Sequence, residues 1–201
     1  LSEAAARTGV PLLQPSQPNG EEFRQQVKAL APDLAVSISY DRILRRPLLE
    51  LPRLGCVNIH AGRLPQYRGR NVINWAILNG ETEIGVTAHM MDEGIDTGDI
   101  LLQRLLPIRW TDTYGDVLAR VVDSIPDLVS ATVQGLADGT VVRRVQPALG
   151  TYFGGRGEGD EWLDWSDTSL NLYNMVRGIS RPGPGARTLL CDRPVIIWRA
   201  E

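Results

Sequence analysis

The sequence contains only two histidines, and one of them, His60, ends a predicted buried strand over residues 55–60. Asn58 lies two residues earlier, so on an extended strand both side chains leave from the same face. In open parallel sheets, ligands bind beyond the carboxyl ends of the strands. An amide donor beside an imidazole can stabilise and protonate a tetrahedral oxyanion. The pair therefore predicts an oxyanion-binding site, and a polar strand end capped by water is the alternative.

The second histidine, His89, lies inside a predicted strand over residues 84–91. We expect it to be a buried, hydrogen-bonded structural histidine. The following turn, residues 92–99, carries four carboxylates in eight residues but lacks the spacing of an EF-hand. A carboxylate of this turn beside His60 would orient the imidazole and raise its pKa. Because acidic turns are usually solvated, we expect no more than one of the four to reach the site.

The composition limits the classes of partner. The 201 residues are 43% hydrophobic and 22% charged, with a net charge of −3, and they include a single lysine, so capture of a nucleic acid is disfavoured. Cys56 and Cys191 lack the spacing of a zinc site or a disulfide framework, which suits a reducing compartment. No apolar run approaches the roughly 20 residues that span a bilayer, and no signal peptide is visible. We therefore expect a soluble cytoplasmic protein with no metal, nucleic-acid or membrane partner.

The elements around His60 alternate between helix and strand. A helix over residues 21–30, a strand over 33–39, a helix over 47–51 and the strand ending at His60 predict a parallel sheet with right-handed crossovers. Further helices are expected at residues 71–78 and 112–136, the second kinked by Pro126, and further strands at 84–91 and 100–108.

The character of the sequence changes after Gly139. A short strand over residues 141–145, a glycine-rich stretch, a helix over 170–179 and a hairpin over 186–198 follow. We expect an open α/β core over residues 1–139 and a small α+β subdomain over residues 140–201. No Gly-x-Ser-x-Gly elbow, phosphate-binding P-loop or complete dinucleotide fingerprint is present.

Four short motifs occur in order at a characteristic spacing. They are Asn58-Ile59-His60, Leu64-Pro65-Gln66-Tyr67-Arg68-Gly69, Gly85-Val86-Thr87 and Asp96-Thr97-Gly98-Asp99. With them the sequence resembles the 10-formyltetrahydrofolate-dependent formyltransferases. The stretches over residues 70–77, 164–166 and 181–186 resemble the branch that formylates nucleotide-linked amino sugars.

The resemblance implies a Rossmann-like, open, mostly parallel sheet with a small C-terminal α+β subdomain. Family members begin with a strand, a glycine-containing turn and a helix that are missing from this sequence. By the same resemblance, Asn58 stabilises the oxyanion, His60 transfers the proton, and Asp96 raises the pKa of His60. The pterin of 10-formyltetrahydrofolate would lie between two strand-end loops, whose edges satisfy its donors and acceptors. The implied folate-binding residues are Arg42, Ile43, Leu44, Arg70, Asp92, Glu93, Gly94, Ile95 and Asp96.

The reaction implied is attack of a neutral amine on the formyl carbon, through a tetrahedral intermediate. The expected acceptor is a nucleotide-linked amino sugar, and the hairpin over residues 186–198 predicts a homodimer. Four alternatives remain: a methionyl-tRNA formyltransferase, which must hold a polyanion, a glycinamide ribonucleotide formyltransferase, a formyl-folate hydrolase, and a non-catalytic folate-binding or oligomerisation module.

Overall fold

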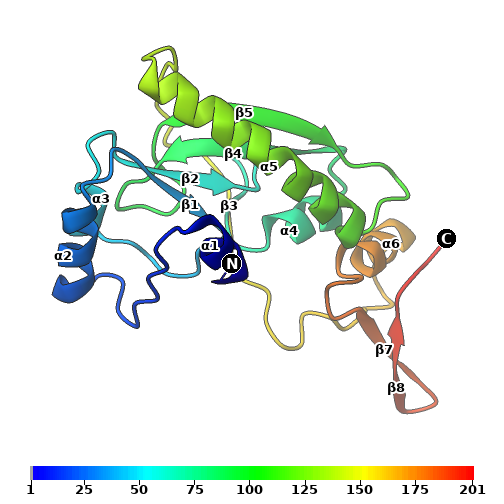
Figure 1. Ribbon diagram of the computed structural model, residues 1–201. Coiled ribbons are helices and arrows are strands. Elements are labelled where there is room, and N and C mark those ends of the chain that lie inside the picture. The colour runs from blue at the N-terminus through cyan, green and yellow to red at the C-terminus, as the bar shows by residue number, and fades with distance from the viewer. Residues whose placement is uncertain (1) are drawn as a thin grey trace.

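The computed structural model describes residues 2–201 of the chain. A four-stranded open sheet lies at the centre of the molecule (Figure 1). The strands stand in the order β1 (Ala35–Ile38), β2 (Cys56–His60), β4 (Glu83–Met90) and β5 (Ile100–Pro107). β1 and β2 are parallel and are connected through the short helix α3 (Arg46–Leu49). The predicted α/β class and the predicted parallel pair that ends at His60 are confirmed.

The other two strand pairs of the described sheet are antiparallel. β4 runs antiparallel to β2 and to β5. The connection between β4 and β5, residues 91–99, contains no helix, and a parallel crossover needs a dozen or more residues. The parallel direction that the sequence predicts therefore holds for β1 and β2, whereas the short connection turns β5 back along β4.

Two helices complete the core. α5 (Tyr114–Ala137) packs on β4 and β5, and α4 (Val72–Leu78) packs against α5. α5 begins with a reciprocal capping box, in which Thr113 and Asp116 satisfy each other's backbone N–H groups. It continues through Pro126 as one helix across the sheet (Figure 1). The buried core includes Val57, Ile77, Val86, Ala88, Val117 and Leu128, each at most 1% exposed. Burying an aliphatic side chain of this kind contributes roughly 1.5–3 kcal/mol.

The C-terminal part of the chain folds back onto the sheet. β6 (Tyr152–Phe153) pairs in parallel with β3 (Arg68–Gly69), which lies in the loop after β2. α6 (Ser169–Gly178) packs on α4, where the Asn74 side-chain amide donates to the Gly178 carbonyl at 2.7 Å. Residues before the predicted division at residue 139 therefore contact residues after it, and the division itself stays a prediction.

The last two strands form the expected hairpin. β7 (Ala186–Leu190) and β8 (Arg193–Ile197) pair in antiparallel fashion around Cys191 and Asp192, which both have positive φ angles. In Figure 1 this hairpin projects from the end of the molecule that carries α6.

The strand predicted over residues 141–145 is wrong. Arg144 and Ile100 exchange two backbone hydrogen bonds of 2.8 and 2.9 Å, but pairing stops there. Val142 and Val145 are 75% and 82% exposed. Without a surface to bury these valines, nothing extends the bridge into a ladder.

The remaining helices are α1 (Ser2–Thr8) and α2 (Glu21–Leu30), and α2 has the predicted bounds. Among the described residues, no helix combines the length and the apolar character needed to cross a membrane.

Candidate active site

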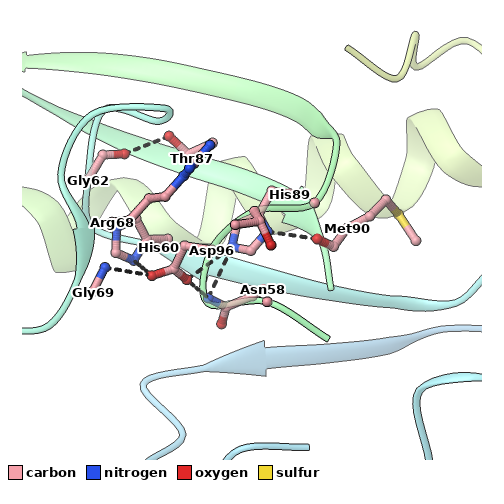
Figure 2. Close-up of polar contacts among 12 residues, drawn as sticks. Asn58, His60, Gly62, Arg68, Gly69, Thr87, His89, Met90 and Asp96 are labelled. Atoms are coloured by element: carbon pink, nitrogen blue, oxygen red, sulfur yellow. Dashed lines mark hydrogen bonds and ion pairs between the residues drawn. The ribbon is translucent and has the colours of Figure 1, made fainter. Parts of the chain in front are cut away.

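Two neighbouring strands bring four polar side chains to one face of the sheet. Because residues alternate along β2, Asn58 and His60 share a face. In the antiparallel register with β4, Asn58 stands opposite His89 and His60 opposite Thr87. Figure 2 shows the two histidines and Asn58 directed toward one point. The antiparallel pairing thus adds β4 residues to the pair that the sequence predicted on β2.

Asp96 lies at that point. Its Oδ2 atom is 3.5 Å from His60 Nδ1, and its Oδ1 atom is 3.4 Å from His89 Nε2. It also accepts hydrogen bonds from the Asn58 side-chain amide at 3.4 Å and from the Gly69 backbone N–H at 2.9 Å (Figure 2). Its side chain is 10% exposed. Asp96 is therefore the acid of the 92–99 turn that contacts both histidines.

The contacts of Asp96 stabilise its charged form. Burial by itself would raise the pKa of this carboxyl group. The hydrogen bond with His89, the attraction of His60 and the Gly69 N–H outweigh burial and lower the pKa below its usual value of 3.8. Asp96 is thus a carboxylate at neutral pH, in contact with both histidines.

His60 has oxygen acceptors at both ring nitrogens. Its Nε2 atom is 2.6 Å from the Tyr67 carbonyl oxygen, so this nitrogen carries the hydrogen in the neutral ring. Nδ1, the nitrogen nearer Asp96, is left as the proton acceptor. Burial lowers the pKa of His60 below its usual value of 6.5, although Asp96 and the Tyr67 carbonyl act in the opposite direction. Asp96 does raise the pKa as expected, but desolvation is larger, so the net shift is downward.

His89 is buried, as expected of a structural histidine, with a side chain 3% exposed. Its Nδ1 atom donates to the Met90 carbonyl at 2.7 Å, and its Nε2 atom lies 3.3 Å from the Asn58 amide nitrogen and near Asp96. Sequence reasoning missed this contact with the site. The antiparallel register, which places His89 opposite Asn58, is the signal that reveals it.

An open cleft of about 900 Å³ leads to this cluster. Its lining includes ten of the eleven residues that the sequence predicted for the site: Arg42, Ile43, Leu44, Asn58, His60, Arg70, Asp92, Gly94, Ile95 and Asp96. On another side, α5 contributes an apolar wall made of Leu118, Val121, Val122 and Ile125. The cleft thus combines two polar loops, an apolar helix face and the cluster of Asn58, His60, His89 and Asp96.

Glu93, the eleventh residue, does not line the cleft. Asp92 accepts hydrogen bonds from the Gly94 N–H at 3.0 Å and from the Thr97 hydroxyl at 2.6 Å, which closes the turn on itself. This turn leaves Glu93 exposed and outside the cleft lining. Glu93 is thus the one predicted folate-binding residue that lies outside the cleft lining, and its role stays a prediction.

The loop after β1 is also held in place. The Asn19 side chain donates to the Ile43 carbonyl at 2.8 Å and accepts from the Arg45 N–H at 2.8 Å. The carbonyl of Ile43 is therefore already paired, although its side chain faces the cleft region and is 68% exposed. Arg70 reaches the same loop through its guanidinium, which donates to the Asp41 carbonyl at 3.5 Å.

The fold and the site define an α/β protein with an amide, an imidazole and a carboxylate gathered at the base of an open cleft. A sequence profile of the family described as formyl transferase matches residues 2–133, and that of the formyl transferase C-terminal domain matches residues 158–201. The chain belongs to the formyl transferase family.

Relatives within this family act on different acceptors. The chain is 36% identical over 200 residues to the methionyl-tRNA formyltransferase of Pelotomaculum thermopropionicum, covering 100% of this chain and 64% of that protein. The chain therefore spans just under two thirds of that relative's length.

Solved structures of related proteins include a protein from Mycobacterium tuberculosis to which sugar N-formyltransferase activity is ascribed. It is 26% identical, has a TM-score of 0.78, and matches over 99% of this chain and 90% of that one. A formyltransferase from Anoxybacillus kamchatkensis, in complex with UDP-4,6-dideoxy-4-formamido-L-AltNAc and tetrahydrofolate, is 28% identical. Its TM-score is 0.56, over 61% of this chain and 64% of that one.

Proposed function

We propose that this protein transfers a formyl group from 10-formyltetrahydrofolate to a primary amine. The observation that carries the proposal is the cluster of Asn58, His60 and Asp96 at the base of the cleft, in a chain that belongs to the formyl transferase family. When bound, the folate supplies a formyl carbon open to attack by the amine. The residues of this chain would supply the proton transfer and the oxyanion donor.

His60 is the proposed proton-transfer residue. Its lowered pKa keeps the ring neutral at neutral pH, so it can accept a proton from the attacking amine. The proton would enter at Nδ1, since Nε2 already donates to the Tyr67 carbonyl. Asp96, 3.5 Å away, would stabilise the resulting imidazolium. The charged ring would then return the proton to the leaving nitrogen.

Asn58 is the proposed oxyanion donor. Its amide nitrogen has two hydrogens, and its contacts with His89 Nε2 and Asp96 Oδ1 are long, at 3.3 and 3.4 Å. In the proposed reaction one N–H of this amide donates to the formyl oxygen, where charge develops. Asp96 and His89 therefore orient the amide that carries this role.

The residues around the cleft fit a folate. Main-chain groups of Arg42 and Leu44 and the turn from Asp92 to Asp96 offer donors and acceptors for the flat edge of a pterin. The guanidinium groups of Arg42 and Arg70 are exposed at the rim and suit an anionic glutamate tail. In this proposal, Glu93 has no part.

For the acceptor we propose a nucleotide-linked amino sugar. The support is the near-complete overlap with a chain of similar size to which sugar N-formylation is ascribed, and the net charge of −3, which disfavours a polyanion. Methionyl-tRNA is the second candidate, because the curated relative at 36% identity formylates it.

The test is an assay of tetrahydrofolate release from 10-formyltetrahydrofolate. The acceptors are a panel of nucleotide-linked amino sugars and, separately, charged initiator tRNA, with His60→Asn as the inactive control. Release that depends on an amino sugar supports the proposal. Release only with the tRNA selects the second candidate, and release without any acceptor identifies a hydrolase. Folate binding without release under any condition overturns formyl transfer.

A further inference from the structure

Outside the two family-profile matches, one side chain of the connecting segment is buried against the site. Residues 134–157 lie between the matches, and the stretch around position 146 is mostly exposed, with Val145 82% and Leu149 88% accessible. Gln146 is the exception, at 9%. A buried amide in an exposed segment must find partners, because an unpaired buried polar group is costly.

The partners of Gln146 are the backbone of the turn that carries Asp96. Its Nε2 atom donates to the Asp96 carbonyl at 2.9 Å and to the Gly98 carbonyl at 2.7 Å. Both amide hydrogens are therefore used, one on either side of Thr97. The Arg144–Ile100 bridge, two residues before Gln146, ties the connecting segment to the start of β5.

Asp96 needs such support. Its φ angle of 55° lies in the left-handed region, which a non-glycine residue adopts only when its surroundings hold it there. With this backbone conformation, the carboxylate points at His60 and His89 (Figure 2). The two hydrogen bonds from the Gln146 side chain hold the main-chain carbonyls of Asp96 and Gly98 in place.

A second link ties Gln146 to the other support of Asp96. The Gln146 Oε1 atom accepts from the Arg68 guanidinium at 2.8 Å. Arg68 is followed by Gly69, whose N–H donates to the Asp96 carboxylate. Gln146 thus contacts both the backbone of Asp96 and the strand β3 that binds its side chain.

We propose that Gln146 is a positioning residue, which holds Asp96 in the left-handed conformation that directs its carboxylate at His60. It does not line the cleft, so it acts through Asp96 and not on a ligand. Its effect on turnover rests on the proposed formyl transfer. Its effect on the geometry of Asp96 and His60 does not.

The central test compares Gln146→Met, which keeps the length of the side chain but removes both donors, with Val145→Ala as the matched control from the adjacent exposed position. The groups that face His60 and Asp96 are His89 from β4, Asn58 from β2, the Tyr67 carbonyl and the β3 backbone. If Asp96 swings away in Gln146→Met, the attraction that raises the pKa of His60 is lost. We expect the NMR titration midpoint of His60 to fall in Gln146→Met and to stay at the wild-type value in Val145→Ala.

The second measurement is turnover. We expect kcat of Gln146→Met to fall by about tenfold or more, because small misplacements of a reacting group cost that much. KM for both substrates should change little, since Gln146 touches neither. Gln146→Glu keeps the pairing with Arg68 but removes the donors, so it should lose kcat as well.

An unchanged His60 midpoint in folded Gln146→Met would overturn the proposal, as would wild-type kcat in that variant. If the wild-type protein transfers no formyl group at all, the proposed function fails, and the His60 titration still decides the role of Gln146. A circular dichroism melt of each variant separates these outcomes from loss of the fold.

Discussion

At the scale of single residues, the site is organised around one carboxylate shared by two histidines. Asp96 contacts His60 and His89 through different oxygens and also accepts from Asn58. Burial opposes charge on both His60 and Asp96, but only Asp96 has enough partners to overcome it. The resting state at neutral pH is therefore a neutral His60 beside a charged Asp96.

The first residue-scale prediction concerns pH and stability. The pKa of His60 in the folded protein lies below the 6.5 expected when unfolded. The unfolded chain therefore binds the proton first as the pH falls, so stability is present above about pH 6.5 and is lost as the pH drops through the folded pKa. The free energy of unfolding in urea should fall between about pH 7.5 and pH 5.5, and should fall less in His60→Asn. Equal losses in the two proteins would contradict the pKa assignment.

Asp96 does not contribute in this pH window. The stability that its charged form provides is lost only as the pH falls below the usual carboxyl pKa of 3.8.

The second residue-scale prediction concerns Asn58. Replacing it with alanine removes the proposed oxyanion donor, and such a loss typically costs about 3 kcal/mol, or on the order of 100-fold in kcat. Steady-state kinetics of Asn58→Ala should show this fall with the fold intact. Asn171→Ala, on α6 and away from the cleft, serves as the control and should keep wild-type turnover. Turnover of Asn58→Ala within a few-fold of wild type would remove Asn58 from the proposed mechanism.

At the scale of elements, short strand pairs position the loops of the candidate site. β3 and β6 pair over only two residues each, yet β3 supplies the Gly69 N–H to Asp96. The ring of Phe153 stacks between those of Tyr67 and Trp75, with centroids 4.8 and 5.5 Å away. This aromatic stack stabilises a pairing that two residues could not maintain alone. The C-terminal part of the chain thus supports the site without lining much of it.

The element-scale prediction concerns Gly69. Its φ angle is +100°, and a Cβ atom there would overlap the Phe153 carbonyl oxygen. Gly69→Ala should therefore separate β3 from β6, withdraw the N–H from Asp96 and lower kcat by about tenfold or more. Gly154→Ala, one residue beyond β6 where a Cβ atom meets nothing within 4 Å, is the matched control. Kinetics and melting temperature of both variants check this. Full activity in Gly69→Ala would mean that the β3 contact is dispensable.

At the scale of the whole molecule, the hairpin of β7 and β8 leaves large apolar side chains exposed. Leu189, Leu190 and Ile196 are 57%, 65% and 44% accessible. Leu189 and Ile196 lie on one face of the hairpin, because Ile196 stands opposite Arg187, two residues before Leu189, and Leu190 lies on the other face. Exposed apolar side chains often mark an interface. The homodimer predicted from the sequence remains a prediction, and the hairpin face of Leu189 and Ile196 is where we expect it to form.

Sedimentation equilibrium tests that prediction. The wild-type protein should have twice the mass of the chain, and Leu189→Asp should shift it toward the monomer, because a buried charge without a partner opposes association. Leu149→Asp, at an exposed apolar position outside the hairpin, should leave the mass unchanged. A wild-type monomer across the accessible concentration range would disprove the dimer.

Much of the local structure follows from the sequence alone. The buried strand predicted over residues 55–60 is β2, and the shared face of Asn58 and His60 follows because the period of a strand is a property of its own backbone. Helical spacing similarly determined α2, with its predicted bounds, and α4 and α5 to within two residues. The strand expected over residues 141–145 failed, because a strand needs a neighbour that local pattern does not report.

Only the tertiary structure decided which distant groups meet at Asp96. Gly69, His89 and Gln146 come from a loop strand, a central strand and the connecting segment, and Gln146 is 50 residues away in the chain. Their contacts depend on strand direction, register and a left-handed turn, which arise from packing between segments. The sequence by itself determined that Asn58 and His60 share one face of β2. Burial and the long-range hydrogen bonds decided that His60 is neutral and Asp96 charged, since desolvation and partner distances exist only in the folded chain.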